Sequence, residues 1–266
     1  TLSLHDALPI WVLHWSLTAL SIATLSACGG GDDPFFPPNV LPAGIHEIST
    51  TDYKATNVGT GSTAQSQDLL TAGLGKTGLG AALPPAYADP AKPTVAELRR
   101  NAIYSNYRGI LDPSAAGGYG TLYGPNVTAD GKVTTSEGLI PGSESLAVLD
   151  DGSGRKQTVI AVQVPDSFDP KRPCIVLGPS SGSRGVYGAM GTAGEWGLKK
   201  GCAVALTDAG KGVGLHNLSD DTLHQVDGSR ASRTAAGTLG FFAAQLSDAA
   251  RAAYNAAFPN RLALKH

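Results

Sequence analysis

The clearest pattern of apolar and polar positions in the chain lies between residues 174 and 208. Cys174 to Leu177 form a short apolar run, and residues 178–185 that follow are rich in glycine and serine. Residues 186–200 are predicted to form a helix, with Gly201 at the position that glycine favours beyond a helix C-terminus. Residues 202–208 are a second apolar run. This strand–loop–helix–strand order predicts two parallel strands joined by a right-handed crossover.

An earlier pair of apolar runs predicts an antiparallel hairpin. Residues 145–149 and 157–164 are the expected strands, and Asp150-Asp-Gly-Ser-Gly154 is the turn between them. A hairpin followed by parallel strand–helix units is how the sheet of an α/β-hydrolase begins. We therefore expect an α/β fold that begins as the N-terminal part of an α/β-hydrolase-like sheet does.

Two further helices are predicted, and one long segment is predicted to lack structure. Thr94-Val-Ala-Glu97 has the spacing of a capping box, so a helix is expected from there to about Tyr107. A second helix is expected in the second half of residues 229–258, ending before Pro259. Residues 29–67 have little periodicity and are predicted to be a flexible tether, which leaves residues 68–266 as the incomplete catalytic domain.

The first 28 residues are interpreted as a signal peptide. An apolar run from Trp11 ends in Leu25-Ser-Ala-Cys28, which resembles the bacterial lipobox and makes Cys28 the candidate for lipidation. The alternative is a cleaved secretory peptide with an incidental cysteine. No Lys or Arg precedes the run, so we interpret the first ten or so residues as an assembly artefact. Either reading predicts an extracellular or periplasmic protein, or an outer-membrane lipoprotein.

Composition limits the partners. The formal net charge is −2 and charged residues make up 16% of the chain, which argues against a nucleic acid partner. Membrane contact is expected only through a lipid anchor at Cys28. The three cysteines lack the spacing of metal ligands, so no metal site is predicted.

Candidate chemistry is concentrated in the loop after residue 177. Its backbone N–H groups lie at the carboxyl end of a predicted strand, where such groups stabilise a developing negative charge. The oxyanion-loop candidates are Ser181, Gly182, Ser183 and Arg184. Arg184 is alternatively a ligand for a substrate carboxylate, because its planar fork suits one. His216 follows the next strand in a predicted loop and is a further site candidate, although most such histidines are structural.

Two motifs match by letter but not by context. Residues 73–77 suggest a nucleotide loop, but the glycine that a P-loop requires is replaced by Leu70. Gly178-Pro-Ser180-Ser-Gly182 fits the nucleophile elbow G-x-S-x-G. It follows only the third predicted strand, and Pro179 lacks the N–H that the residue before a nucleophile normally carries. Ser180 is therefore not expected to be the nucleophile.

Several longer segments of the sequence resemble one family, the D-(−)-3-hydroxybutyrate oligomer hydrolases. The likeness runs in order from about residue 68 to residue 266. Its most specific segments are residues 68–80, 96–108, 150–156, 181–188, 194–199 and 258–261.

This resemblance implies a secreted bacterial serine esterase. Such enzymes cleave the short esters released from poly(3-hydroxybutyrate), by acyl transfer to a serine and then to water, without a metal or organic cofactor. The ligand is a small-molecule ester. The family's serine lies in a Ser-Asn-Gly-Gly-type turn that is absent here, so the nucleophile is expected beyond His266. The chain is accordingly expected to be an N-terminal fragment that is inactive alone.

Two other functions stay open from the sequence. One is a different secreted α/β-hydrolase esterase, of the feruloyl-esterase kind. The other is a non-enzymatic surface lipoprotein.

A disulfide is predicted between Cys174 and Cys202. Each cysteine opens one of two strands that are neighbours in the α/β-hydrolase order, and neighbouring strands lie within the Cα separation that a disulfide accepts. Export would place the pair in an oxidising compartment. The alternative is a pair of buried free cysteines.

Overall fold

The computed structural model describes residues 40–55, 67–150, 157–182, 184–209, 214–240, 242–244, 246–260 and 263–265. The chain divides into two units, Thr1–Ala43 and Gly44–His266. The elements described below all belong to the second unit. The predicted signal peptide, Cys28, and most of the predicted tether lie outside the described residues.

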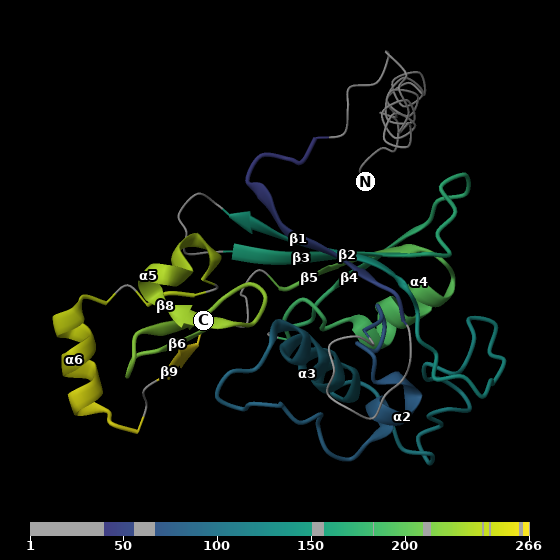
Figure 1. Ribbon diagram of the computed structural model, residues 1–266, viewed down its shortest axis with the longest axis horizontal. Helices are drawn as coiled ribbons and strands as arrows, with labels where there is room; N and C mark the ends of the chain where they lie inside the picture. Colours follow the sequence, from purple (N-terminus) through teal and green to yellow (C-terminus); the bar gives the residue numbers. More distant parts are fainter. Residues whose placement is uncertain are drawn as a thin grey trace, which may run out of the picture. The chain divides into compact units, whose positions relative to one another are not determined.

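The second unit contains the following elements in chain order (Figure 1). They are β1 (Ile45–Tyr53), α2 (Gly75–Gly80), α3 (Val95–Arg108), β2 (Gly142–Asp150), β3 (Gln157–Pro165), β4 (Ile175–Pro179), the π-helical turn η2 (Met190–Gly194), α4 (Glu195–Lys199), β5 (Ala203–Thr207), β6 (Leu215–Asn217), β7 (Thr222–His224), β8 (Arg230–Ser232), α5 (Arg233–Ala236), the 3-10 turn η3 (Gly237–Leu239), α6 (Asp248–Ala257) and β9 (Ala263–Lys265).

The main sheet has the strand order β1-β2-β3-β5-β4. β2 and β3 pair antiparallel along their whole lengths, which confirms the predicted hairpin. β4 and β5 pair in parallel from Ile175↔Ala203 to Pro179↔Thr207, as the strand–loop–helix–strand pattern predicted. β5 lies between β3 and β4, with Ile160 of β3 opposite Thr207 of β5. The carboxyl ends of β4 and β5 therefore lie at the same edge of the sheet.

The edge strand β1 corrects the predicted tether. Residues 45–53, placed in the tether, pair antiparallel with β2 from Ile45↔Leu149 to Tyr53↔Gly142. The register shifts between Glu47 and Ser49, which indicates a β-bulge. A bulge inserts one extra residue and breaks the two-residue alternation. The apolar side chains consequently lack the period that identifies a strand in sequence.

The crossover helix is shorter than predicted. Helical structure begins with the π-helical turn at Met190 and continues as α4 only to Lys199, so residues 186–189 are outside it. A Cβ at Gly197 would lie 2.7 Å from Cγ2 of Val204 and 3.0 Å from Cβ of Val176. Glycine at this position lets α4 approach β4 and β5 closely. Residues 186–189 form turns that lead into the helix.

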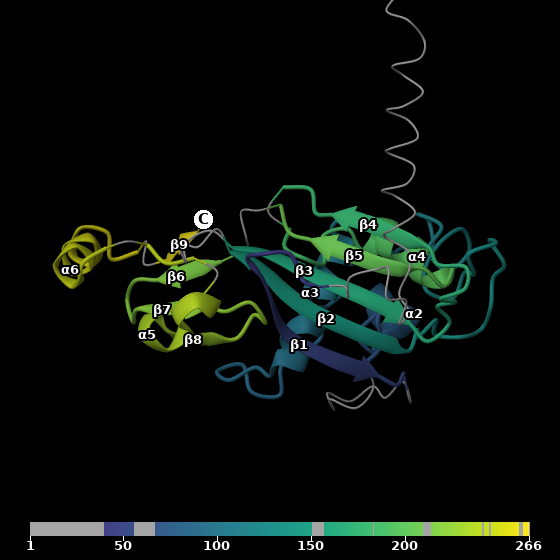
Figure 2. The same ribbon diagram turned by 90° about the horizontal axis from the view of Figure 1, so that it is seen from above.

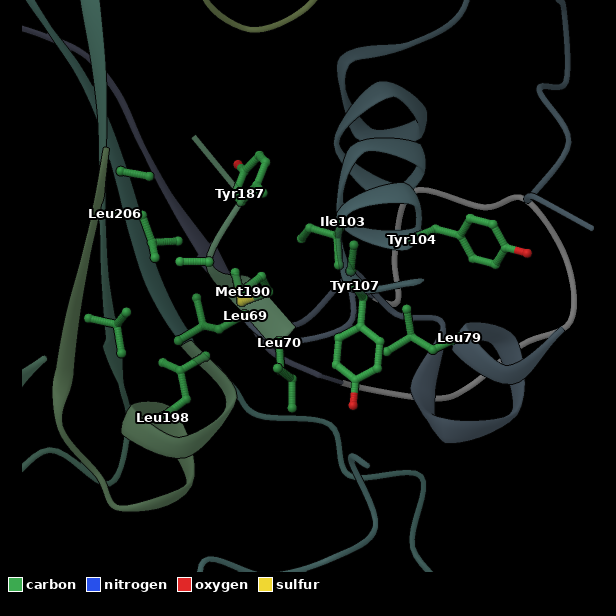
Figure 3. Packing of buried hydrophobic residues seen from close by; sticks show 14 of the residues in the cluster. Leu69, Leu70, Leu79, Ile103, Tyr104, Tyr107, Tyr187, Met190, Leu198 and Leu206 are labelled. Atoms are coloured by element: carbon green, nitrogen blue, oxygen red, sulfur yellow. The ribbon is translucent and has the colours of Figure 1, made fainter. Parts of the chain in front are cut away.

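One face of the main sheet carries the core. Tyr107 and Ile103 of α3, Met190 of η2 and Leu198 of α4 are buried in one cluster with Leu206 of β5. Figure 3 shows these side chains converging from the helices onto the strands. The turn of chain that holds Leu69 and Leu70 fills the space between them.

The opposite face is open in the described chain. Ile175 and Leu177 of β4 are 68% and 72% exposed, and Val162 and Leu149 are exposed on the same sheet. Val162 and Leu177 are both opposite Ala205, so they lie in one row across the strands. With Ile175 and Leu149, this row forms an apolar strip on the face of the sheet that points away from α3 and α4. Figure 2 shows these two helices behind the strands.

Strands between Leu215 and Lys265 form a separate small sheet with the order β8-β7-β6-β9. α6 spans Asp248–Ala257 and is N-capped by Ser247, which confirms the helix predicted before Pro259. α3 is capped by Thr94 with Glu97 in the predicted capping box. No helix in the described residues has the length and apolar character needed to cross a bilayer.

Candidate functional site

The glycine-rich loop starts at the carboxyl end of β4, beside the end of β5. The backbone N–H of Ser180 donates to the carbonyl oxygen of Thr207 at 2.8 Å, which extends the parallel pairing by one residue. Ser181 and Gly182 then leave the sheet and are exposed. The loop therefore occupies the edge at which parallel strands of α/β sheets present ligand sites.

Two of the four oxyanion candidates, Ser181 and Gly182, have backbone N–H groups that are not used inside the described structure. Gly182 has φ +63°, a left-handed backbone that glycine adopts without strain. No described residue accepts a hydrogen bond from the backbone N–H of Ser181 or Gly182. Such unengaged N–H groups at a strand end are the kind of donor that stabilises an oxyanion. Ser183 lies outside the described residues.

Arg184, the fourth candidate, contacts the end of helix α3. Its Nη2 donates to the carbonyl oxygen of Gly109 at 2.8 Å, where Gly109 is the C-cap of that helix. A cation at this position is favoured by the negative end of the helix dipole. One arm of the guanidinium is thus engaged in positioning the loop, and the residue is partly exposed.

Ser180 is not placed as a nucleophile. Its residue is 8% exposed, and its Oγ is buried without a hydrogen-bond partner. A Cβ at Gly188 would lie 2.1 Å from this Oγ, so the hydroxyl is packed against that glycine. No hydrogen bond joins a serine to a histidine anywhere in the described residues.

His216 lies in strand β6 and not in the loop that was predicted, and its side chain is fully buried. Its Nδ1 accepts a hydrogen bond from the backbone N–H of Ala244 at 3.1 Å, and its Nε2 lies 2.9 Å from Oδ1 of Asp221. An Nδ1 that accepts leaves Nε2 as the donor to the carboxylate. Both ring nitrogens are engaged, which is the arrangement of a structural histidine.

Asp221 is the centre of a charged cluster around that histidine. It forms ion pairs with Arg233 at 3.2 Å and with Arg251 at 3.7 Å. Although partial burial alone would raise the pKa of Asp221, hydrogen bonding to His216 and the two arginines hold it below its ordinary value. The cluster ties β6 to α5 and α6, and it explains why this histidine is retained in the interior.

Cys174 and Cys202 form the predicted disulfide, with Cα atoms 4.8 Å apart. Cys174 directly precedes β4 and Cys202 directly precedes β5. The backbone N–H of Ala203 donates to the carbonyl oxygen of Cys174 at 3.0 Å. The bond therefore fixes the start of the parallel pair whose far end carries the glycine-rich loop.

A buried polar cluster lies between helix α3 and the main sheet, and the sequence analysis did not predict it. Arg99 donates from Nε and Nη2 to the two carboxylate oxygens of Glu144, each at 2.9 Å. Glu144 also accepts from Gln163 at 2.6 Å and from the hydroxyl of Tyr187 at 2.8 Å. Burial alone would raise the pKa of Glu144, but Arg99 and these hydrogen bonds outweigh it and hold the pKa below its ordinary value.

A cavity of about 400 Å³ opens above this cluster. It lies between β1, β2, α3, the end of the glycine-rich loop and residues 226–228. Arg184, Gly185 and Val186 line it, so the cavity adjoins the candidate oxyanion loop. The described residues contain no group of three or more side chains that could hold a metal ion.

Two carboxylates hold the segment 68–80 in place through hydrogen bonds. Asp68 accepts hydrogen bonds from the backbone N–H groups of Leu70, Thr71, Gly73 and Ile140, at 2.8–3.1 Å. Glu137 accepts from the backbone N–H of Thr77 at 2.8 Å and from its hydroxyl at 2.7 Å. The donors that a nucleotide phosphate would need are thus used by the protein's own carboxylate.

Comparisons with known proteins agree over nearly the whole chain. The family model described as 3HB-oligomer hydrolase matches residues 24–266. A D-(−)-3-hydroxybutyrate oligomer hydrolase of Polaromonas naphthalenivorans is 56% identical over 253 residues, which are 94% of this chain and 34% of that protein. Those of Burkholderia cenocepacia and Paraburkholderia xenovorans are 51% and 52% identical, with 95% and 94% of this chain and 35% of each protein covered.

The chain spans about a third of the length of these curated relatives. No solved structure matches it. The match to the family model covers the strands of both sheets, the glycine-rich loop, the disulfide and the cavity. The chain belongs to the 3HB-oligomer hydrolase family.

Proposed function

We propose that the protein of which this chain is part is a secreted serine esterase that hydrolyses dimers and short oligomers of 3-hydroxybutyrate. The observation that carries the proposal is the match to the family over residues 24–266, with 51–56% identity to relatives named for this activity. The named substrate is an ester, so the reaction is acyl transfer to water.

The proposed fold is an α/β-hydrolase-like sheet. The order β2-β3-β5-β4 supports it, because an antiparallel hairpin is followed by a parallel pair in which the later strand lies inside the earlier one. The apolar strip of Ile175 and Leu177 supports it as well. Strands of α/β sheets are normally covered on both faces, so we propose that the rest of the protein covers this strip.

The proposed chemistry assigns one part to this chain. The backbone N–H groups of Ser181 and Gly182 stabilise the oxyanion that forms when a serine attacks the ester carbonyl. The serine and its histidine base lie in the rest of the protein. We therefore propose that this chain alone is inactive, since Ser180 is buried against Gly188 and no described histidine contacts a serine.

The test compares the whole protein with this chain. The whole protein should release 3-hydroxybutyrate from the dimer and hydrolyse p-nitrophenyl butyrate, with little turnover of methyl ferulate. The chain alone should release no product from any of them. Preferred turnover of methyl ferulate would favour a feruloyl-esterase function, and absence of all turnover by the whole protein would reject an esterase. Turnover by the chain that is lost in Ser180→Ala would make Ser180 the nucleophile.

We also propose export, with Cys28 as a lipidated N-terminus. The support is the apolar run from Trp11 and the Leu25-Ser-Ala-Cys28 sequence. Palmitate labelling of the natural protein in its host should mark the wild type and not Cys28→Ser. A labelled Cys28→Ser variant, or an unlabelled protein found in the cytoplasm, would contradict the proposal.

A further inference from the structure

The cavity beside the glycine-rich loop has walls that suit a small apolar body. Its volume is about 400 Å³, within the usual range for small-molecule pockets. Its apolar lining comes from three elements: Ile48 of β1, Leu146 of β2, and Leu98 and Ala102 of α3. Val186 and Val226 close it. Such walls provide contact area for methyl and methylene groups without selecting for charge.

The charged groups at the base of the cavity cancel each other. Arg99 and Glu144 both line it, but they are paired with each other at 2.9 Å and are 5% and 2% exposed. The guanidinium also stacks over the ring of Tyr53, 4.3 Å from its centroid. The base is therefore neutral and already saturated with hydrogen bonds, so it offers no strong site for an ion.

The rim of the cavity carries a cation without a counter-ion. Arg184 forms no ion pair with any described residue, and only its Nη2 is engaged, by the carbonyl oxygen of Gly109. Its Nε and Nη1 remain as donors. The rim's carboxylate, Asp227, accepts from the backbone N–H and hydroxyl of Ser229 through Oδ1. The layout is an apolar chamber with one available guanidinium at its entrance, and with the carboxylate of Asp227, hydrogen-bonded to Ser229, on the same rim.

We propose that this cavity is the subsite for the carboxylate-terminated end of a short 3-hydroxybutyrate ester. The carboxylate pairs with Arg184, and the methyl-bearing chain lies against Leu98, Ala102 and Leu146. Arg184, Gly185 and Val186 line the cavity, so the ester group next to the terminal unit is placed on the side of the cavity where the glycine-rich loop ends. The identity of the ligand rests on the proposed function, while the preference for a carboxylate on an apolar chain rests on the cavity itself.

The test measures binding to the full 266-residue chain, so it does not depend on turnover. Isothermal titration with the 3-hydroxybutyrate dimer is compared with its methyl ester, which keeps the chain and lacks the charge. The acid should bind roughly ten- to one-hundredfold more tightly, the factor expected of a hydrogen bond to a charged group. This comparison uses the unaltered protein, so it stands even where a variant fails to fold.

Two variants locate the site. Arg184→Gln should bind acid and methyl ester equally, and Ala102→Leu should weaken both by filling the chamber. Arg172→Gln and Ala96→Leu are matched controls, because Arg172 pairs with Asp169 on another loop and Ala96 lies on α3 outside the lining. Neither control should change binding. Circular dichroism of each variant verifies the fold.

Several results would overturn the inference: no binding of the acid, equal affinity for acid and methyl ester, or unchanged binding in Ala102→Leu. Hydrolysis of the dimer by the whole protein is measured separately. If hydrolysis occurs while the chain shows no preference for the acid, the subsite is wrong and the proposed function stands. If the chain shows the preference while the whole protein hydrolyses no hydroxybutyrate ester, the proposed function is wrong and the carboxylate site stands.

Discussion

The guanidinium of Arg99 and the carboxylate of Glu144 meet through two hydrogen bonds of 2.9 Å inside the molecule. Arg99 belongs to α3 and Glu144 to β2, so the pair joins the main helix to the sheet. Arg99 also donates to the carbonyl oxygens of Asp68 and Leu69. A single side chain thus connects three segments that are far apart in the sequence.

Glu144→Gln is expected to be among the most destabilising single substitutions in this region. It leaves Arg99 charged and buried without its partner, and breaking a buried pair in this way costs about 3–5 kcal/mol. Asp169→Asn is the control, because its pair with Arg172 is exposed and worth at most about 1 kcal/mol. Urea denaturation of the two variants measures the difference. Equal midpoints for the two variants would show that the buried pair is not what holds α3 on the sheet.

Stability should depend on pH through the same carboxyl group. The pKa of Glu144 lies below its ordinary value of 4.5 in the folded protein. The unfolded chain therefore binds the proton first, and the stabilisation is complete above about pH 4.5 and is lost as the pH falls through the folded pKa. Urea denaturation between about pH 3 and pH 7 should show this loss. In the Glu144→Gln variant, the free energy of unfolding should fall less between about pH 7 and pH 3. If it falls as much as in the wild type, other carboxylates cause the loss of stability at low pH.

Gly188→Ala should destabilise the glycine-rich loop by overpacking. The new Cβ would lie 2.1 Å from Oγ of Ser180 and 3.0 Å from Cβ of Arg184. Forcing a methyl group into such a space costs about 1–3 kcal/mol. Ser180→Ala alone removes an unpartnered buried hydroxyl and should be close to neutral. The double variant Ser180→Ala/Gly188→Ala should therefore have a higher melting temperature than Gly188→Ala. If the destabilisation of the double variant equals the sum of the two single effects, the methyl group does not clash with the Ser180 hydroxyl.

The disulfide predicts a simple thiol count. In a Cys28→Ser variant produced in an oxidising compartment, the denatured and non-reduced protein should contain no free thiol. Cys174 and Cys202 are 28 positions apart. Closing a loop of that size stabilises the folded state by about 3–4 kcal/mol in the chain-entropy model. Reduction should lower the unfolding midpoint accordingly, and two reactive thiols in the non-reduced protein would exclude the bond.

Local signals in the sequence were sufficient for part of the fold. Three signals depend only on residues close in the sequence: Gly201, the capping box of Thr94 and Glu97, and the alternation in residues 157–164. The elements that they predicted are present. The pairing of Cys174 with Cys202 also follows from strand order. The bulge at Glu47 depends on pairing with β2, and residues 186–189 form turns that no local signal separates from the helix, so β1 and the short α4 were not predictable in the same way.

The polar interior needed information from distant residues. Arg99 and Glu144 are 45 positions apart, and nothing near either residue indicates the other. One signal was present: Gln163 is a polar residue at an inward position of a predicted strand. Its partner Glu144, which is directly opposite it, precedes the other predicted strand by one residue. The position of His216 was missed for a related reason, since one of its two ring contacts is the backbone N–H of Ala244, 28 positions later.

The place of β5 between β3 and β4 has a consequence for the timing of synthesis. β4 is complete at Pro179, but its neighbour ends at Thr207, 28 residues later. At about 5–20 residues per second, β4 waits roughly 1–6 s after it is made before β5 is complete. During that interval Ile175 and Leu177 belong to a strand whose described partner has not yet been made. The link between Cys174 and Cys202 forms only after both strands have reached an oxidising compartment, so the oxidation state of these thiols during export marks when β4 and β5 have come together.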